Sequence, residues 1–534
     1  MQSFRRLAAI ATALCVSAAF TNADEKALNP QIRKIVDEVS EARIKAILEK
    51  LVSFGTRNTM SNPDDPAHGV GAARQWILKE MQGYSPKLQV RFDKYRVKKQ
   101  GQRVFKDVDL YNVIAVLPGT KMPETQILIS GHYDSLNLGT RPAGAPAGPG
   151  TDAAPAPPGE RAPQAPLSLE QQEKNAELPA PGACDDGSGT AAVMELARVM
   201  SQYQFDKTLV FVAFAGEEQG LIGSSLQAVK SHKENLMIEA VLNNDIIGTD
   251  TSGNGRMGNT SVSVYSDESP DSPSQQLSRY ARDVAERYIP AMKVDTVFMG
   301  DRLGRGGDHT PFQWEGYAAV RFSTPNEIYA NQHRATDLLE NMSVPYTTKV
   351  ARVNAAVAAS LALAPKAPIV TRAPGARGGA RGGATDGANT QANAGGGRGA
   401  NASAGGTAEG ATGGGRGGAG AGDGANAGGR GGAAGGRRPQ PMIARGSGYD
   451  AVLSWRPAGP EEDVKGYTVV VRSTTAPYWE QEIYVGKVTT FTMKDVSIDD
   501  AKFGVKAIGS DGAESLVTPY VYPPRVKTEI ETVQ

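Results

Sequence analysis

Residues 208–218 read TLVFVAFAGEE, an apolar run that stops at a glycine and two adjacent glutamates. A continuous run of this length, rich in β-branched and aromatic residues, predicts a buried strand. Two further apolar runs also end at polar residues. Residues 125–130 lead into His132, and residues 240–242 lead into Asp245. Polar side chains therefore stand where each predicted strand ends.

Helical patterns separate these predicted strands. Residues 190–200 and 224–231 each show the spacing of an amphipathic helix. Strands that alternate with helices predict an α/β fold, with a mostly parallel central sheet flanked by helices. Ligands of such sheets bind beyond the carboxyl ends of the strands. We therefore expect the residues at the strand ends to meet in one pocket.

Two histidines and four acidic residues are the candidates for that pocket. They lie in the segments GHYDS, CDDGSG, GEE, NND and NQH, as His132, Asp185, Glu217, Glu218, Asp245 and His333. Zinc binds imidazole nitrogen and carboxylate oxygen, and a catalytic site leaves one position open. Two zinc ions about 3.5–4 Å apart need a shared carboxylate and further ligands on each side. The six residues meet that demand.

With these motifs the chain resembles the secreted di-zinc aminopeptidases, whose relatives include glutamate carboxypeptidase and the glutaminyl cyclases. The resemblance covers roughly residues 30–365. It implies two Zn²⁺ per chain and peptide substrates. The ligands that it implies are His132, Asp185, Glu218, Asp245 and His333, with Asp185 bridging the two ions.

The resemblance also implies that Glu217 is the general base. Neighbouring residues at a strand end project in different directions, so Glu218 can face a metal while Glu217 faces water. Asp134 is expected to support His132, since metal-bound imidazoles donate their second N–H to a carboxylate or carbonyl. Asp308 and His309 are expected to line the pocket wall, as substrate contacts or as structural hydrogen-bonding groups.

Each candidate also suits a simpler role when it is taken alone. A polar residue after a strand is commonly part of a surface loop, and DDGSG is typical of a turn that caps a helix. Asp134 also suits an Asx turn. Among whole-protein functions, the alternatives are a carboxypeptidase with the same ligands and a catalytically silent adhesive or receptor-like protein that keeps the fold.

The first residues predict export. Residues 1–23 contain Arg5 and Arg6, then an apolar run from Leu7 to Phe20, then small residues. This is the pattern of a cleaved signal peptide, too short to act as a stable membrane anchor. We expect the mature protein in the periplasm or outside the cell. Its single cysteine, Cys184, then excludes an intramolecular disulfide.

The expected peptidase domain spans residues 24–365 and contains a Pro/Ala/Gly-rich insertion at 139–181. Connections of this length are either functional covers or passive loops. Because the insertion joins the segments that bear His132 and Asp185, it is expected at the rim of the pocket. Residues 168–177 predict a short helix within it.

The remainder predicts a linker and a small β domain. Residues 366–445 are rich in Gly, Ala and Arg and predict a disordered linker. Its Arg-Gly-Gly repeats do not favour nucleic acid, because no aromatic residue lies between them and the chain has zero net charge. Residues 446–525 resemble a fibronectin type III β-sandwich with Trp455 and Tyr467 in its core. The candidate ligands of this domain are a protein and a polysaccharide. The linker predicts two independent cores.

Overall fold

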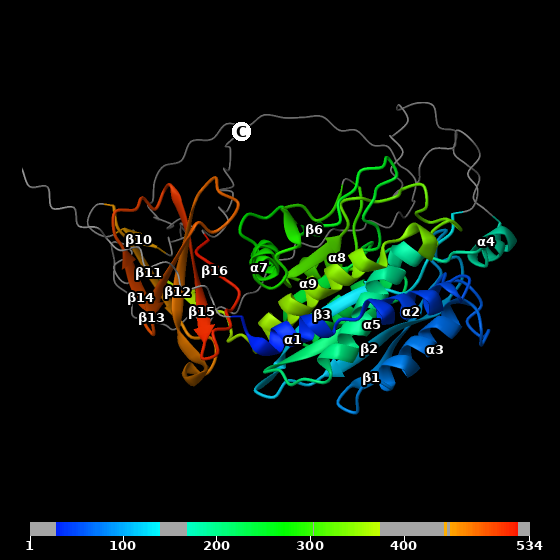
Figure 1. The fold of residues 1–534 in the computed structure, drawn as a ribbon, viewed down its shortest axis with the longest axis horizontal. Coiled ribbons are helices and arrows are strands. Elements are labelled where there is room, and N and C mark those ends of the chain that lie inside the picture. The colour runs from blue at the N-terminus through cyan, green and yellow to red at the C-terminus, as the bar shows by residue number, and fades with distance from the viewer. Residues whose placement is uncertain (1–27, 139–167, 303, 374–442, 446–448, 522–534) are drawn as a thin grey trace, which may run out of the picture.

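The computed structural model describes residues 28–138, 168–302, 304–373, 443–445 and 449–521. An α/β part and a smaller β part lie side by side (Figure 1). The expected signal peptide and most of the expected linker fall outside the described residues. Within the described ranges, no helix combines the length and apolarity that crossing a bilayer requires.

The α/β part is built on one eight-stranded sheet in the order β1-β2-β4-β3-β5-β8-β6-β7. Its four central strands, β4, β3, β5 and β8, are parallel, whereas β1, β2 and β6 each pair antiparallel with a neighbour. The predicted α/β fold with a mostly parallel sheet is confirmed. The strands are β1 Gln89–Val97, β2 Val108–Leu117, β3 Met122–His132, β4 Lys207–Phe214, β5 Met237–Asn244, β6 Ser261–Tyr265, β7 Lys293–Val297 and β8 Ala319–Ser323.

Both faces of the central strands are buried, which accounts for their continuous apolar runs. In β4, Leu209 and Phe211 pack into one hydrophobic core, and Val210 and Val212 pack into the other. Alternate side chains of a strand point to opposite faces. Residues from α1, α2, α3, α5, α7 and α9 join the first core, and residues from α6 and α8 join the second.

The helices have the following bounds: α1 Pro30–Glu38, α2 Glu41–Val52, α3 Gly69–Gln82, α4 Leu169–Ala176, α5 Ser188–Met200, α6 Ile222–Lys233, α7 Pro273–Tyr288, α8 His309–Trp314 and α9 Val344–Leu363. Helix α4 lies where residues 168–177 predicted one, and the Ser168 hydroxyl accepts from the Gln171 N–H at its start. The side-chain oxygen thereby satisfies one of the free amides of the first turn.

The β part consists of two antiparallel four-stranded sheets, β10-β11-β14 with β9, and β13-β12-β15-β16. Trp455 and Tyr467 pack edge to face in its core, with ring centroids 5.6 Å apart. Their expected role as core aromatics therefore holds. The strands are β9 Ile369–Thr371, β10 Ala444–Arg445, β11 Ala451–Arg456, β12 Val464–Ser473, β13 Gln481–Gly486, β14 Thr490–Met493, β15 Ala501–Gly509 and β16 Thr518–Pro519.

The expected domain boundary between residues 365 and 366 needs a correction. Strand β9 precedes the Gly/Ala/Arg-rich segment, yet it pairs with β11 of the sandwich, as β10 does after that segment. Ser454 and Val452 each pair with β14 on their other side, so β9 and β10 share one edge of β11. The segment thus begins and ends on the sandwich and does not join two separate domains.

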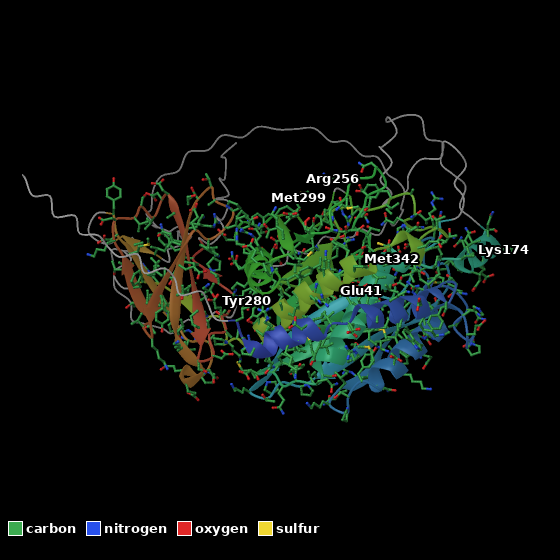
Figure 2. All side chains as sticks on the ribbon, in the orientation of Figure 1. Glu41, Lys174, Arg256, Tyr280, Met299 and Met342 are labelled. Carbon is green, nitrogen blue, oxygen red and sulfur yellow. The ribbon has the colours of Figure 1, made fainter. Side chains whose placement is uncertain are left out.

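The two cores are not independent, contrary to the sequence-based expectation. Asp271, just before α7, accepts hydrogen bonds of 2.7 and 2.9 Å from Arg472 of β12, and Arg279 lies 3.3 Å away. All three side chains are buried. The Tyr280 hydroxyl donates to the Glu514 carbonyl at 3.1 Å, and Figure 2 shows Tyr280 between the two parts. A buried ion pair therefore fastens the sandwich to α7.

The variant Asp271→Ala tests this contact. Removing the shared carboxylate leaves Arg472 and Arg279 buried without their counter-charge, which typically costs about 3–5 kcal/mol. We expect a loss of that size in the free energy of unfolding, measured with urea. Asp295→Ala is the control, because the Asp295–Lys293 pair is exposed and exposed pairs contribute about 1 kcal/mol or less. Equal losses would mean that the ion pair does not hold the parts together.

Two deletions test the revised boundary. Joining Ala373 to Ile443 through a short Gly-Ser link keeps β9 and β10 on β11, so the melting temperature should not change. Ending the chain at Pro365 removes the whole sandwich and uncovers Tyr280, so the melting temperature should fall. Differential scanning calorimetry measures both, and a stable chain ending at Pro365 would restore the view of two independent cores.

Candidate metal centre

The six candidate residues lie together beyond the carboxyl ends of the central strands. His132 ends β3, the two glutamates follow β4 after Gly216, and Asp245 follows β5. Asp185 lies in the turn before α5, and His333 lies in the loop between β8 and α9. Parallel strands bring these ends to one edge of the sheet, so residues far apart in sequence become neighbours.

The candidates form two groups in which potential ligand atoms lie within 4.8 Å of one another. One group is His132, Glu217 and Asp245, and the other is Asp185, Glu218 and His333. Asp185 stands between them, with Oδ1 3.3 Å from Nε2 of His132 and Oδ2 3.2 Å from Nε2 of His333. Each oxygen of one carboxylate therefore faces a different histidine.

The donor atoms of these groups fit metal ions. Nε2 of His132 and Oε1 of Glu218 are buried and make no hydrogen bond within the described part of the chain. A buried polar atom without a partner is costly, and a bound ion is one of the groups that can satisfy it. Imidazole nitrogens combined with carboxylate oxygens are a typical zinc donor set.

Asp134 connects two of the ligand segments. Its backbone carbonyl lies 3.1 Å from Nδ1 of His132, so this nitrogen donates and Nε2 presents its lone pair to the centre. Its carboxylate accepts the backbone N–H groups of Glu217 and Glu218, each at 3.2 Å. Burial raises the pKa of Asp134 to about 6. The residue thus supports both His132 and the two glutamates.

Asp186 is a residue that strand-end reasoning missed. Its Oδ2 accepts the backbone N–H of His132 at 3.1 Å, and its Oδ1 accepts those of Gly189 at 2.8 Å and Ile246 at 3.2 Å. The carboxylate is completely buried. It joins the end of β3, the start of α5 and the segment after β5. The only signal in the sequence was its place beside Asp185.

Asp337 and Arg57 are two further supports that the sequence did not reveal. Asp337 accepts the backbone N–H groups of Cys184 and Asp185, both at 2.9 Å. Buried Arg57 donates to the carbonyl oxygens of Tyr133 at 2.6 Å and Gly182 at 2.8 Å. Together they hold the turn of Asp185 against the end of β3. Neither residue follows a predicted strand, so position alone did not mark them.

The remaining candidates have different surroundings. Burial raises the pKa of the Cys184 thiol, and Cys184 belongs to neither ligand group. Nε2 of His309 lies 2.6 Å from the Gly300 carbonyl, and burial lowers the pKa of this histidine to about 4. His309 therefore holds a loop as a neutral ring. Asp308 is fully buried, and burial raises its pKa to about 7.

Glu217 differs from Glu218 in its environment. The side chain of Glu218 is buried and lies 3.1 Å from Nε2 of His333, whereas Glu217 is partly exposed. Burial of its carboxylate raises the pKa of Glu217, with Asp245 adding to the effect and His132 opposing it. Adjacent residues thus place one carboxylate within the second group and one within the first.

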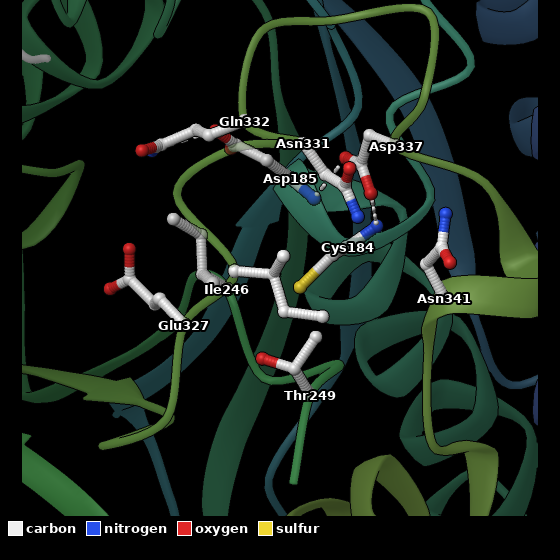
Figure 3. A pocket seen from close by; sticks show the side chains of 10 residues that line it. Cys184, Asp185, Ile246, Thr249, Glu327, Asn331, Gln332, Asp337 and Asn341 are labelled. Atoms are coloured by element: carbon white, nitrogen blue, oxygen red, sulfur yellow. Dashed lines mark hydrogen bonds between the residues drawn. The ribbon is translucent and has the colours of Figure 1, made fainter. Parts of the chain in front are cut away.

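A small cleft opens beside Asp185 (Figure 3). Its lining includes three acidic residues and no basic residue. It is lined by Cys184, Asp185, Ile246, Thr249, Glu327, Ile328, Asn331, Gln332, Asp337 and Asn341. Its carboxylates suit a cationic or hydrogen-bond-donating group.

The described flanks of the 139–181 insertion reach the site. The N–H of Leu138 donates to the carbonyl of His333 at 3.1 Å, and the N–H of Ala180 donates to the carbonyl of Gly55 at 2.9 Å. The rim position predicted from the sequence therefore agrees with these contacts. Residues 139–167 of this insertion lie outside the described residues, so the choice between a functional cover and a passive loop stays a prediction.

The variant Asp186→Asn tests whether the buried carboxylate joins the ligand segments. Its amide nitrogen must face at least one N–H that the carboxylate accepts, and an unsatisfied buried group costs about 1–3 kcal/mol. We expect that loss in the free energy of unfolding, measured with urea on metal-free protein. Exposed Asp64→Asn should change it by less than about 0.5 kcal/mol. Equal stability of the two variants would contradict the role of Asp186.

This chain is similar in sequence to a known peptidase family and to proteins described as zinc metalloproteases. Residues 112–358 match the profile of peptidase family M28. A "Probable zinc metalloprotease" of Pyricularia oryzae is 33% identical over 523 residues, which cover 91% of this chain and 84% of the relative. A protein of the same description from Pyrenophora teres f. teres is 30% identical over 526 residues, covering 92% and 86%.

Among solved structures, the LapA aminopeptidase of Legionella pneumophila is 19% identical with a TM-score of 0.44. The match covers 62% of this chain and 74% of that chain.

Proposed function

This chain belongs to the zinc metalloproteases of peptidase family M28, and we propose that it is an exported aminopeptidase that uses two zinc ions. The observation that supports the two-metal centre best is the placement of Asp185, whose two oxygens face His132 and His333 at 3.3 and 3.2 Å. A carboxylate that faces two donor groups at once suits a bridging ligand.

The proposed ligands divide evenly around that bridge. His132 and Asp245 would hold one zinc ion, Glu218 and His333 would hold the other, and Asp185 would be shared. When bound, zinc supplies Lewis acidity toward a peptide carbonyl and toward water. The chain itself supplies the proton transfer, in which a carboxylate oxygen of Glu217 takes a proton from water and returns it to the leaving nitrogen.

The geometry around Glu217 supports its role as the base. Its backbone N–H is held by Oδ1 of Asp134, which fixes the residue where β4 ends. Burial raises the pKa of Glu217, which makes its carboxylate a stronger proton acceptor. Because the backbone carbonyl of Asp134 also contacts His132, one residue sets the position of the base relative to a proposed ligand.

An amino terminus suits the cleft better than a carboxyl terminus does. The lining of the cleft contains Asp185, Glu327 and Asp337, and it contains no Lys or Arg. A carboxypeptidase needs a cationic partner for the terminal carboxylate, whereas an aminopeptidase needs anionic or hydrogen-bond-accepting groups for the terminal ammonium. Arg305 pairs with Glu327 at 2.9 Å, so it is the hydrogen-bond acceptors of the lining, and not a net negative charge, that support the aminopeptidase over its closest alternative.

A matched pair of variants separates the base from the ligands. Glu217→Gln removes the proton acceptor but no proposed ligand, so kcat should fall about 10²–10⁴-fold while two zinc ions remain. Glu218→Gln removes a proposed ligand, so zinc content should fall as well. Elemental analysis after dialysis and hydrolysis of leucine 4-nitroanilide measure both effects. Near-normal turnover by the Glu217 variant would exclude it as the base.

A substrate panel tests the proposed specificity for chain ends. Leucine 4-nitroanilide and leucine amide should be hydrolysed, whereas N-acetyl-leucine 4-nitroanilide should not, because acetylation removes the terminal ammonium that the hydrogen-bond acceptors of the cleft would bind. Peptides blocked at the amino end but free at the carboxyl end are the reverse probe. Preferential hydrolysis of that probe would favour a carboxypeptidase, and no hydrolysis of any substrate would favour a silent homologue.

Export is proposed from the signal-like residues 1–23. Expression of the full chain in a bacterial host should deliver mature protein to the periplasm or the medium. Amino-terminal sequencing should then find Asp24 as the first residue, since cleavage is expected after Ala23. Cytoplasmic protein that keeps its first residues would contradict this part of the proposal.

A further inference from the structure

A buried arginine lies against one of the proposed metal ligands. Arg321 is in β8, where the residue is only 1% exposed and its neighbours Val320 and Phe322 are apolar. Strand β8 is parallel to β5, and Arg321 is paired with Asn243, two residues before Asp245. The register of the sheet therefore brings a positive charge beside the carboxylate that follows β5.

The guanidinium contacts two carboxylates on opposite sides. Its Nη2 lies 3.0 Å from Oδ1 of Asp245, and its Nη1 donates to Oδ2 of Asp301 and to the Gly306 carbonyl, the latter at 2.8 Å. The same Oδ1 of Asp245 lies 3.7 Å from Nε2 of His132. The oxygen that faces the first ligand group is thus the one that Arg321 contacts.

The buried charge of Arg321 is compensated by the two carboxylates that it contacts. The guanidinium of an arginine stays charged in proteins, and the compensating carboxylates are those of Asp245 and Asp301. Without that charge, the carboxylate of Asp245 would lie beside that of Glu217 with no arginine to compensate it. Like charges in a medium of low dielectric constant repel strongly, and their side chains turn apart where they can.

We propose that Arg321 is a positioning residue for the metal centre: it fixes Oδ1 of Asp245 toward His132 and so prepares the first ligand group for its zinc ion. This inference rests on the proposed function. Groups that orient metal ligands in this way typically contribute 10–100-fold to metal affinity. The effect is confined to one of the two ions, because Arg321 contacts no member of the group of Asp185, Glu218 and His333 in the described structure.

The alternative is that Arg321 only holds the loop of Asp301 and Gly306. The two roles differ in which contact of Arg321 affects zinc binding: the contact with Asp245 in the proposed role, and the contact with Asp301 in the alternative. Asp301→Asn weakens the contact to the loop and leaves the contact between Arg321 and Asp245 in place. Arg321→Met removes both contacts. Arg321→Lys keeps the charge but offers one ammonium group where the guanidinium reaches two carboxylates.

The test is zinc binding to metal-free protein, measured by competition with a chromophoric chelator. Wild-type protein should bind two zinc ions. Arg321→Met should bind one of them 10–100-fold more weakly and leave the other unchanged, Arg321→Lys should show a smaller loss, and Asp301→Asn should bind both as the wild type does. Equal loss at both sites, no loss in Arg321→Met, or the same loss in Asp301→Asn would overturn the inference.

A double variant separates folding from positioning. Arg321→Met leaves Asp301 buried without this partner, whereas Arg321→Met combined with Asp301→Leu replaces the pair by apolar groups, which is often neutral for stability. The double variant should regain part of the unfolding temperature that Arg321→Met loses, because Asp301 is no longer a buried unpaired charge, and it should keep the weakened site. Recovery of both stability and affinity would overturn the inference. Wild-type protein that binds no zinc would instead contradict the proposed function.

Discussion

The arrangement of the centre depends on one buried carboxylate that binds no proposed metal. Asp186 accepts backbone N–H groups of His132, Gly189 and Ile246, which belong to three different segments of the fold. Each bond alone is modest, but loss of the common acceptor would leave buried N–H groups without partners. Because two of these segments bear His132 and Asp245, the distance between proposed ligands is set through the main chain.

Around that anchor, the site balances an excess of negative charge with cations of different kinds. Asp185, Glu217, Glu218 and Asp245 lie within two small groups, and the positive charge of Arg321 contacts Asp245. Such crowding is costly unless the charges are compensated. Two divalent ions would provide that compensation, and Arg321 on one flank would keep Asp245 in place before an ion arrives.

The sandwich is part of the same folded unit. An ion pair between Arg472 and Asp271 joins the sandwich to the start of α7. Strand β9 follows the last helix of the α/β part after a short connection, and it pairs with β11 of the sandwich. The Gly/Ala/Arg-rich segment leaves and rejoins that edge. A composition typical of a linker therefore does not establish that the parts on either side are separate.

The sequence by itself determined the class of fold and the proposed ligands. The apolar runs before His132, Glu217 and Asp245 form β3, β4 and β5, since a strand buried on both faces must be apolar throughout. Local patterns of this kind are visible without coordinates. They also marked Trp455 and Tyr467 as core residues of the sandwich.

Only the tertiary structure decided which side chains support those ligands and how the parts join. Asp337 reaches Asp185 across 152 positions, and Arg321 reaches Asp245 from a neighbouring strand. An arginine within an apolar strand and an aspartate in a loop have no distinctive local pattern, since their roles come from partners distant in sequence. The docking of Arg472 on Asp271 depends in the same way on a contact between surfaces, which periodicity and composition do not encode.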